Sequence, residues 1–192
     1  MLIGFNKPFG VISQFSPSGG KPTLKDFVDL PDIYPAGRLD TDSEGLLLLT
    51  DDGVLQARIA DPGHRLAKTY WVQVEGAPVA TDLAPLLRGI DLGDFVTRPA
   101  RASIIADPKN LWERVPPVRF RQSIPTTWLE IVISEGKNRQ VRRMTAKIGF
   151  PTLRLVRVRI GNWSIETIAP GQWQQLAVPP DMLRRANSPK KP

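Results

Sequence analysis

The stretch PAGRLDTDSEGLLLLTDDG, residues 35–53, joins five carboxylates and one basic side chain to a run of four leucines. The run Leu46–Leu49 is far shorter than the ~20 apolar residues that cross a bilayer, and it predicts a buried strand. Asp40 precedes this strand in a loop, where the edge of a core can hold a carboxylate rigidly. Such a carboxylate serves a structural ion pair, a hydrogen bond to a base edge, or chemistry.

The chain around this stretch is basic, with a net charge of +7 over 192 residues, a length that suggests one domain or one domain with two lobes. Residues 1–100 carry 9 Lys and Arg against 13 Asp and Glu, a net −4, whereas residues 101–192 carry 17 against 6, a net +11. Eight basic residues and no acidic one lie between Gly136 and Ile165. This concentration predicts a polyanionic partner, and a solvated basic face is the alternative.

Several function classes are disfavoured by composition. The chain has no cysteine, which excludes disulfides and cysteine-based zinc sites, and its single histidine, His64, has no partner at metal-binding spacing. Residues 1–13 lack the features of a signal peptide, so we expect a cytoplasmic protein without a membrane span. Residues 19–23, GGKPT, fail as a phosphate-binding loop because Pro22 follows the lysine.

Short strands alternate irregularly with a few helices, which predicts an α+β fold with a largely antiparallel sheet. Thr50 is expected to cap the helix that follows the leucine run. Gly149 is expected to end the helix over 138–148. The long segment 108–125, rich in proline and arginine, is expected to be an ordered loop. Strands are expected over 2–5, 11–15, 46–49, 68–75, 95–106, 128–134 and 153–160, and helices over 51–60, 81–88 and 138–148, with one or two helical turns over 23–28.

Five blocks of sequence resemble a known family. Gly37–Asp40 followed by Asp42–Leu46 is similar to the catalytic motif of pseudouridine synthases, in the branch that modifies bacterial ribosomal RNA at single uridines. Each further block is modest alone, but all follow in the order and rough spacing of the family. These blocks are Asn6-Lys7-Pro8, Lys68-Thr69-Tyr70, Glu135–Met144 and Leu155–Gly161.

The resemblance implies the pseudouridine synthase fold, a mostly antiparallel mixed sheet in two lobes with a central active-site cleft flanked by helices. It implies a catalytic domain over 1–183 and a flexible basic tail over 184–192. Because Asn6 opens the first block, the small RNA-binding domain that usually precedes it is expected to be absent. The segment 112–128 is similar to a large-subunit member, which implies large-subunit ribosomal RNA or its assembly intermediate as partner. A monomer without cofactor or metal is expected.

The resemblance also assigns roles to residues. Asp40 matches the essential carboxylate, which attacks C1′ or removes a sugar proton, and Arg142 matches the buried cation that keeps it ionised. Tyr70 matches the tyrosine that stacks on the target base. The alternatives are an ordinary phosphate contact for Arg142 and a core aromatic residue for Tyr70.

The resemblance further implies residues that contact the substrate. Leu155 would pack against the flipped base. Arg38 would probe the RNA near the vacated base position or form a structural salt bridge. The candidates for phosphate contacts are Lys137, Arg139, Arg143 and Arg157.

Two other functions compete with this interpretation. A nucleosidase-like hydrolase would pair Asp40 with Asp42 or Glu44 across a glycosidic bond. A non-catalytic RNA-binding or ribosome-assembly protein would tolerate replacement of Asp40, because no chemistry would be lost.

Overall fold

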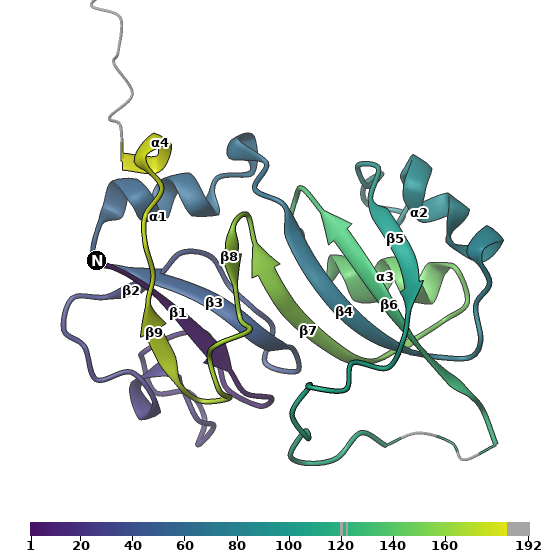
Figure 1. Cartoon of the computed structure of the whole chain (residues 1–192), viewed down its shortest axis with the longest axis horizontal. Helices are drawn as coiled ribbons and strands as arrows, with labels where there is room; N and C mark the ends of the chain where they lie inside the picture. Colours follow the sequence, from purple (N-terminus) through teal and green to yellow (C-terminus); the bar gives the residue numbers. More distant parts are fainter. Residues whose placement is uncertain (120, 122, 184–192) are drawn as a thin grey trace, which may run out of the picture.

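A mixed sheet runs through the chain in the order β5-β6-β4-β7-β3-β1-β9, with β2 paired to β3 and β8 to β7 (Figure 1). The computed structural model describes residues 1–119, 121 and 123–183, so the predicted tail over 184–192 lies outside the described residues. The strands are β1 (Leu2–Lys7), β2 (Tyr34–Pro35), β3 (Glu44–Thr50), β4 (Lys68–Glu75), β5 (Arg101–Ile105), β6 (Thr126–Ile133), β7 (Thr152–Ile160), β8 (Trp163–Ser164) and β9 (Trp173–Gln175).

The sheet consists of two lobes that meet at one short seam. All strand pairs are antiparallel except β3 with β7, which pair in parallel at Glu44–Val156 and Gly45–Arg157. We call β5, β6, β4 and β7 the β4 lobe, β2, β3, β1 and β9 the β3 lobe, and these two pairings the seam. Only glycine fits at residue 45, because a Cβ there would lie 2.3 Å from the Arg157 carbonyl oxygen and φ is +105°. The predicted α+β fold, with its mostly antiparallel sheet in two lobes, is confirmed.

The four leucines are fully buried because both faces of β3 are covered. Leu46 and Leu48 pack with Leu2, Val156 and Trp163 on one face, whereas Leu47 and Leu49 pack with Phe5 and Leu24 on the other. A strand buried on both sides is an uninterrupted apolar run rather than an alternating one. The leucine run therefore anchors the loop that carries Asp40 to two hydrophobic clusters at once.

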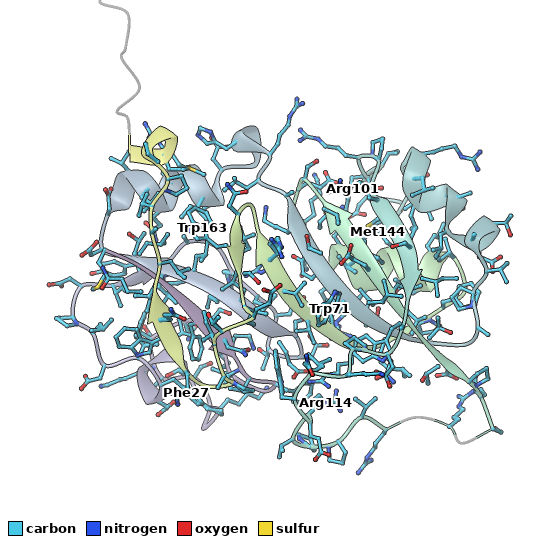
Figure 2. All side chains as sticks on the ribbon, in the orientation of Figure 1. Phe27, Trp71, Arg101, Arg114, Met144 and Trp163 are labelled. Carbon is cyan, nitrogen blue, oxygen red and sulfur yellow. The ribbon has the colours of Figure 1, made fainter. Side chains whose placement is uncertain are left out.

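Helices cover the lobes and flank the centre of the sheet (Figures 1 and 2). Met144 on α3 is fully buried in the cluster of the β4 lobe, and Leu55 and Ile59 on α1 pack against the β3 lobe. The helices are α1 (Gly53–Ala60), α2 (Ala84–Arg88), α3 (Gln140–Lys147) and α4 (Pro180–Leu183), with single 3-10 turns η1 (Leu24–Asp26), η2 (Pro62–His64) and η3 (Ala80–Leu83).

Three predicted elements differ most from the structure. The cap of α1 is Asp52, which accepts from the Val54 and Leu55 amides at 2.8 and 3.1 Å, and Thr50 ends β3 instead. The strand expected over 95–106 is shortened to β5, because the chain first turns back at Thr97, whose amide donates to Ile90, and then passes Pro99. Residues 11–15 form an isolated bridge and bends rather than a strand.

Candidate active site

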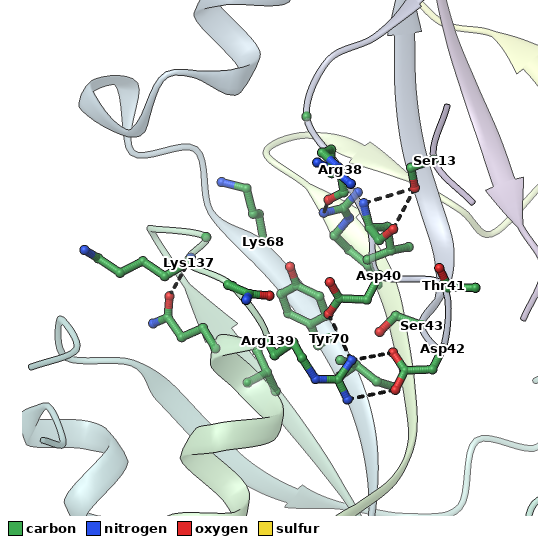
Figure 3. Close-up of a pocket in the computed structure, with 18 of the residues that line it drawn as sticks. Ser13, Arg38, Asp40, Thr41, Asp42, Ser43, Lys68, Tyr70, Lys137 and Arg139 are labelled. Atoms are coloured by element: carbon green, nitrogen blue, oxygen red, sulfur yellow. Dashed lines mark hydrogen bonds and ion pairs between the residues drawn. The ribbon is translucent and has the colours of Figure 1, made fainter. Parts of the chain in front are cut away.

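The loop that carries Asp40 connects β2 to β3 and is fixed at both ends. The Ser13 hydroxyl donates to the Leu39 carbonyl at 2.7 Å and accepts from the Leu39 amide at 3.2 Å. The Ser43 amide donates to the Asp40 carbonyl at 3.0 Å. The Asp40 side chain is 36% exposed and opens into a cavity of about 1140 Å³ (Figure 3).

This cavity brings together most of the residues predicted to act on a substrate. Asp40 comes from the β3 lobe, whereas Tyr70 on β4 and Leu155 on β7 come from the β4 lobe, and the Tyr70 ring lies beside the Asp40 carboxylate (Figure 3). Tyr70 and Leu155 are 6% and 5% exposed, so the cavity has an apolar wall. Seven of the nine predicted residues line it: Arg38, Asp40, Tyr70, Lys137, Arg139, Leu155 and Arg157.

The cation nearest to Asp40 differs from the prediction. Arg139 Nη1 lies 3.9 Å from Asp40 Oδ2, whereas Arg142 contacts Asp42, donating Nη2 to its main-chain oxygen at 2.6 Å. Within the described residues, Arg142 Nε is buried and has no hydrogen-bond partner. Arg142 lies one helical turn after Arg139, so both guanidiniums point toward the same segment of the loop.

The charges of Asp42, Arg139 and Arg142 shift one another's pKa values. Partial burial opposes ionisation of Asp42, but hydrogen bonds from Arg139 and the charges of Arg142 and Arg139 outweigh it and lower the pKa of Asp42. Hydrogen bonding to Asp42 raises the pKa of Arg139. Burial lowers the pKa of Arg142, against the opposite effect of Asp42. The loop thus holds an ionised carboxylate between two guanidiniums, next to Asp40.

Besides Arg139, two predicted phosphate contacts are engaged within the protein. Arg157 is 4% exposed and donates Nε to the Leu46 carbonyl at 2.8 Å and Nη1 to the Arg38 carbonyl at 3.4 Å. These two hydrogen bonds connect Arg157 to the main chain on both sides of the loop that carries Asp40. Arg143 donates to the Leu92 carbonyl at 3.0 Å and forms an exposed ion pair with Asp94. Arg38 is exposed and forms no salt bridge among the described residues.

Glu44 is buried inside the fold and does not line the cavity. Its carboxylate accepts from Arg154 Nε and Nη2 at 2.8 Å each and from Trp112 Nε1 at 2.8 Å, and its side chain is 2% exposed. Three of its roughly four acceptor positions are thus used inside the fold. This excludes Glu44 as the second acid of the hydrolase hypothesis and leaves only Asp42, which is paired with arginines.

Two lysines of the recognised blocks have a place in the site that sequence reasoning missed. Lys7 is fully buried beneath the loop and donates to the Val11 and Pro8 carbonyls at 2.8 and 2.9 Å. Burial lowers its pKa to about 7, although Glu44 opposes the shift. Lys68 lines the cavity, and burial lowers its pKa as well. The sequence signal that could have identified both lysines was their position in the blocks Asn6-Lys7-Pro8 and Lys68-Thr69-Tyr70.

Metal binding and membrane insertion find no support in the described part of the chain. No three side chains of the His, Cys, Asp and Glu types come together there in a way that could hold a metal ion. None of the helices within residues 1–119, 121 and 123–183 has the length and apolar character needed to cross a membrane.

Comparison with known proteins identifies the class of protein to which this fold and cavity belong. Residues 1–147 match the family described as RNA pseudouridylate synthase. The chain belongs to this family, and it is an RNA pseudouridine synthase.

Similar proteins include the ribosomal large subunit pseudouridine synthase E of Vibrio vulnificus, which is 57% identical over 93% of this chain and 76% of its own length. The protein of the same name from Xanthomonas campestris pv. campestris is 56% identical over 91% of this chain and 94% of its own. A crystal structure of a pseudouridylate synthase superposes with a TM-score of 0.76 at 31% identity, covering 92% of this chain and 70% of that one. The family predicted from the sequence blocks is confirmed.

Proposed function

We propose that this chain converts a uridine of large-subunit ribosomal RNA to pseudouridine, with Asp40 as the reactive carboxylate. The observation that carries the proposal is the meeting of Asp40, Tyr70 and Leu155 in one cavity, from opposite sides of the seam. The choice of RNA is supported by two relatives that are named for the large subunit and match more than nine-tenths of the chain.

The reaction is an isomerisation that needs access to both faces of the base. The bond between C1′ and N1 breaks, the base turns, a bond forms between C1′ and C5, and the C5 proton is released while N1 gains one. A uridine in structured RNA must first leave its stack. The cavity of about 1140 Å³ is large enough for such a nucleotide and has a polar and an apolar side.

The residues of the cavity divide this work. The Asp40 carboxylate acts at the sugar, in its ionised form, by attacking C1′ or by removing a sugar proton. The Tyr70 ring stacks on the base, and Leu155 packs against it, so that the base keeps a defined plane while it turns. No cofactor is required for these steps.

Cations around the cavity bind the RNA backbone. Arg38, Lys137 and Arg139 line the cavity, and Lys137 Nζ lies 4.6 Å from the centre of the Phe95 ring. Affinity for RNA should therefore fall steeply with salt. Selection of the target rests on the catalytic domain and its 112–125 segment, acting as a cytoplasmic monomer on ribosomal RNA or an assembly intermediate.

Mapping of pseudouridines in cells with and without this gene tests the proposal. We expect one position in large-subunit RNA to lose its pseudouridine, and a plasmid-borne copy to restore it. An unchanged map, or a lost site in another RNA, contradicts the proposed substrate. The same map made with an Asp40→Asn copy separates an enzyme from a non-catalytic assembly protein, because only the latter keeps its effect.

A further inference from the structure

Asp42, the second carboxylate of the loop, is held by two arginines, and the chemistry above gives Asp42 itself no role. Arg139 donates Nη1 and Nη2 to its two oxygens at 2.9 and 2.8 Å. Arg142 donates Nη2 to its main-chain oxygen at 2.6 Å, with Nε 3.5 Å from Oδ2. One carboxylate therefore acts as counter-ion to two guanidiniums, and Figure 3 shows its pairing with Arg139.

Asp40 is left almost without polar contacts by this arrangement. Within the described residues its carboxylate accepts no hydrogen bond, and its one ion pair, with Arg139 Nη1, is 3.9 Å long. That distance is too long for a hydrogen bond. Arg139 is thus shared unequally, bound in a bidentate pair to Asp42 while lying within reach of Asp40.

The backbone of Arg139 indicates that this sharing is built into the fold. Arg139 has φ +49°, in the left-handed region that is unfavourable for a residue with a Cβ atom. It immediately precedes α3, and this conformation directs its side chain across the cleft to the opposite lobe. Strained residues of this kind persist where surrounding contacts stabilise them, and here those contacts are the two bonds to Asp42.

We propose that Asp42 is a positioning residue for the isomerisation: it binds Arg139 and Arg142 and so keeps the oxygens of Asp40 free for the uridine. The proposal rests on the proposed role of Asp40. Asp42 itself would not touch the substrate.

The physical reason is competition between two carboxylates for the same guanidinium. Without the charge of Asp42, Arg139 would have Asp40 as its nearest counter-ion, and a short movement would form a bidentate pair with it. That pair would cover the oxygens that must approach the sugar. Asp42 prevents this because its two hydrogen bonds hold Arg139 in place.

Replacement of Asp42 by asparagine tests the inference. We expect kcat at saturating RNA to fall on the order of ten- to a hundredfold, with KM little changed, measured as release of tritium from large-subunit RNA labelled at uridine C5. Asp42→Glu keeps the counter-ion and should retain most of the activity. Circular dichroism and thermal unfolding establish that the variants are folded.

A double variant distinguishes positioning from general support of the structure. In Asp42→Asn with Arg139→Gln, no guanidinium from residue 139 can close on Asp40, so kcat should recover above that of Asp42→Asn alone. A merely structural role predicts the opposite, because two structural losses would add. Arg139→Gln alone is measured at saturating RNA, which separates any loss of RNA affinity from kcat.

A folded Asp42→Asn enzyme with wild-type kcat, or a double variant no faster than Asp42→Asn, overturns the proposal. If Asp42→Asn does not fold, Asp42→Ser with and without Arg139→Gln makes the same comparison. Failure of the proposed function gives a different result, since the wild-type protein would then release no tritium from the labelled RNA.

Discussion

The chain holds two groups of acids and their partners whose carboxylates lie within a few residues of each other and whose characters are opposite. The cleft cluster consists of Asp40, Asp42, Arg139 and Arg142. The buried cluster consists of Glu44, Arg154 and Trp112. The carboxylates of the cleft cluster are 36% and 37% exposed, whereas that of the buried cluster is 2% exposed.

The difference lies in how completely each carboxylate is satisfied. Glu44 accepts three short hydrogen bonds and is enclosed by the fold, so no group from outside the protein reaches its oxygens. Asp40 accepts none among the described residues, although Arg139 lies nearby. A satisfied buried network specifies one conformation, whereas an incompletely satisfied carboxylate beside a cavity is available for chemistry. Four residues along the chain therefore separate a carboxylate that opens into the cavity from one that is enclosed in the fold.

Replacement of Asp40 by asparagine should have the largest effect on activity. We expect the release of tritium from uridine-labelled RNA to fall at least about a thousandfold, because the charged form of this carboxylate is required. RNA binding, measured by filter retention, should survive. Asp51→Asn is the matched control, because Asp51 lies in the same stretch but pairs with the N-terminal amine. Equal turnover by the Asp40→Asn and wild-type proteins would make the cleft cluster as structural as the buried one.

Replacement of Glu44 by glutamine should have the largest effect on stability. Loss of its charge leaves Arg154 buried without a counter-ion, which typically costs about 3–5 kcal/mol. Urea denaturation measures the difference, and turnover per folded molecule should stay close to wild type. Glu130→Gln is the matched control, because Glu130 also accepts from a tryptophan, Trp71, at 3.3 Å but has no arginine partner among the described residues. A total loss of activity in folded Glu44→Gln would restore the two-acid hypothesis.

Lys7 is coupled to both clusters, because the negative charges of Glu44, Asp42 and Asp40 each act to raise its pKa. Its pKa is lowered to about 7 in the folded protein from an ordinary 10.5, so the unfolded chain binds the extra proton between these values. The contribution of Lys7 to the free energy of unfolding should therefore rise with pH across this window, by up to about 1.4 kcal/mol per unit. Urea denaturation of wild type and Lys7→Met at pH 7 and 9.5 measures it. Parallel pH curves would contradict the shift.

Arg143 should give the smallest effect, since its partner Asp94 is exposed and ion pairs of that kind contribute little. We expect Arg143→Gln to leave the melting temperature unchanged. If RNA phosphate displaces Asp94, the slope of log affinity against log salt becomes shallower by about 1 in this variant. An unchanged slope would show that Arg143 stays with Asp94 and contacts no phosphate.

Local pattern predicted much of this fold. The strand β4 was predicted with both ends correct, because the sequence of Lys68–Glu75 alternates and is rich in aromatic and β-branched residues. The leucine run was predicted as a buried strand because it lacks polar residues. These features depend on neighbours in the chain, which the sequence displays directly.

Partnerships across the chain could not be predicted in the same way. Glu44 was considered as a second acid beside Asp40, but it pairs with Arg154, which lies 110 residues away. Arg142 was expected beside Asp40, yet the left-handed backbone of Arg139 brings a different guanidinium there. Several arginines near α3 are chemically equivalent as candidates, and only the path of the chain decides which one reaches the carboxylate.

Because the seam between β3 and β7 is short, the distance from Asp40 to Tyr70 depends on the angle between the two lobes. The two residues come from opposite sides of a pairing that covers only two residue pairs. The chain contains no cysteine, so two introduced thiols, one per lobe, could carry a pair of fluorescent dyes without competing labels. Energy transfer between the dyes would then report the geometry of the catalytic pair in solution, as RNA is added, without a probe inside the cavity.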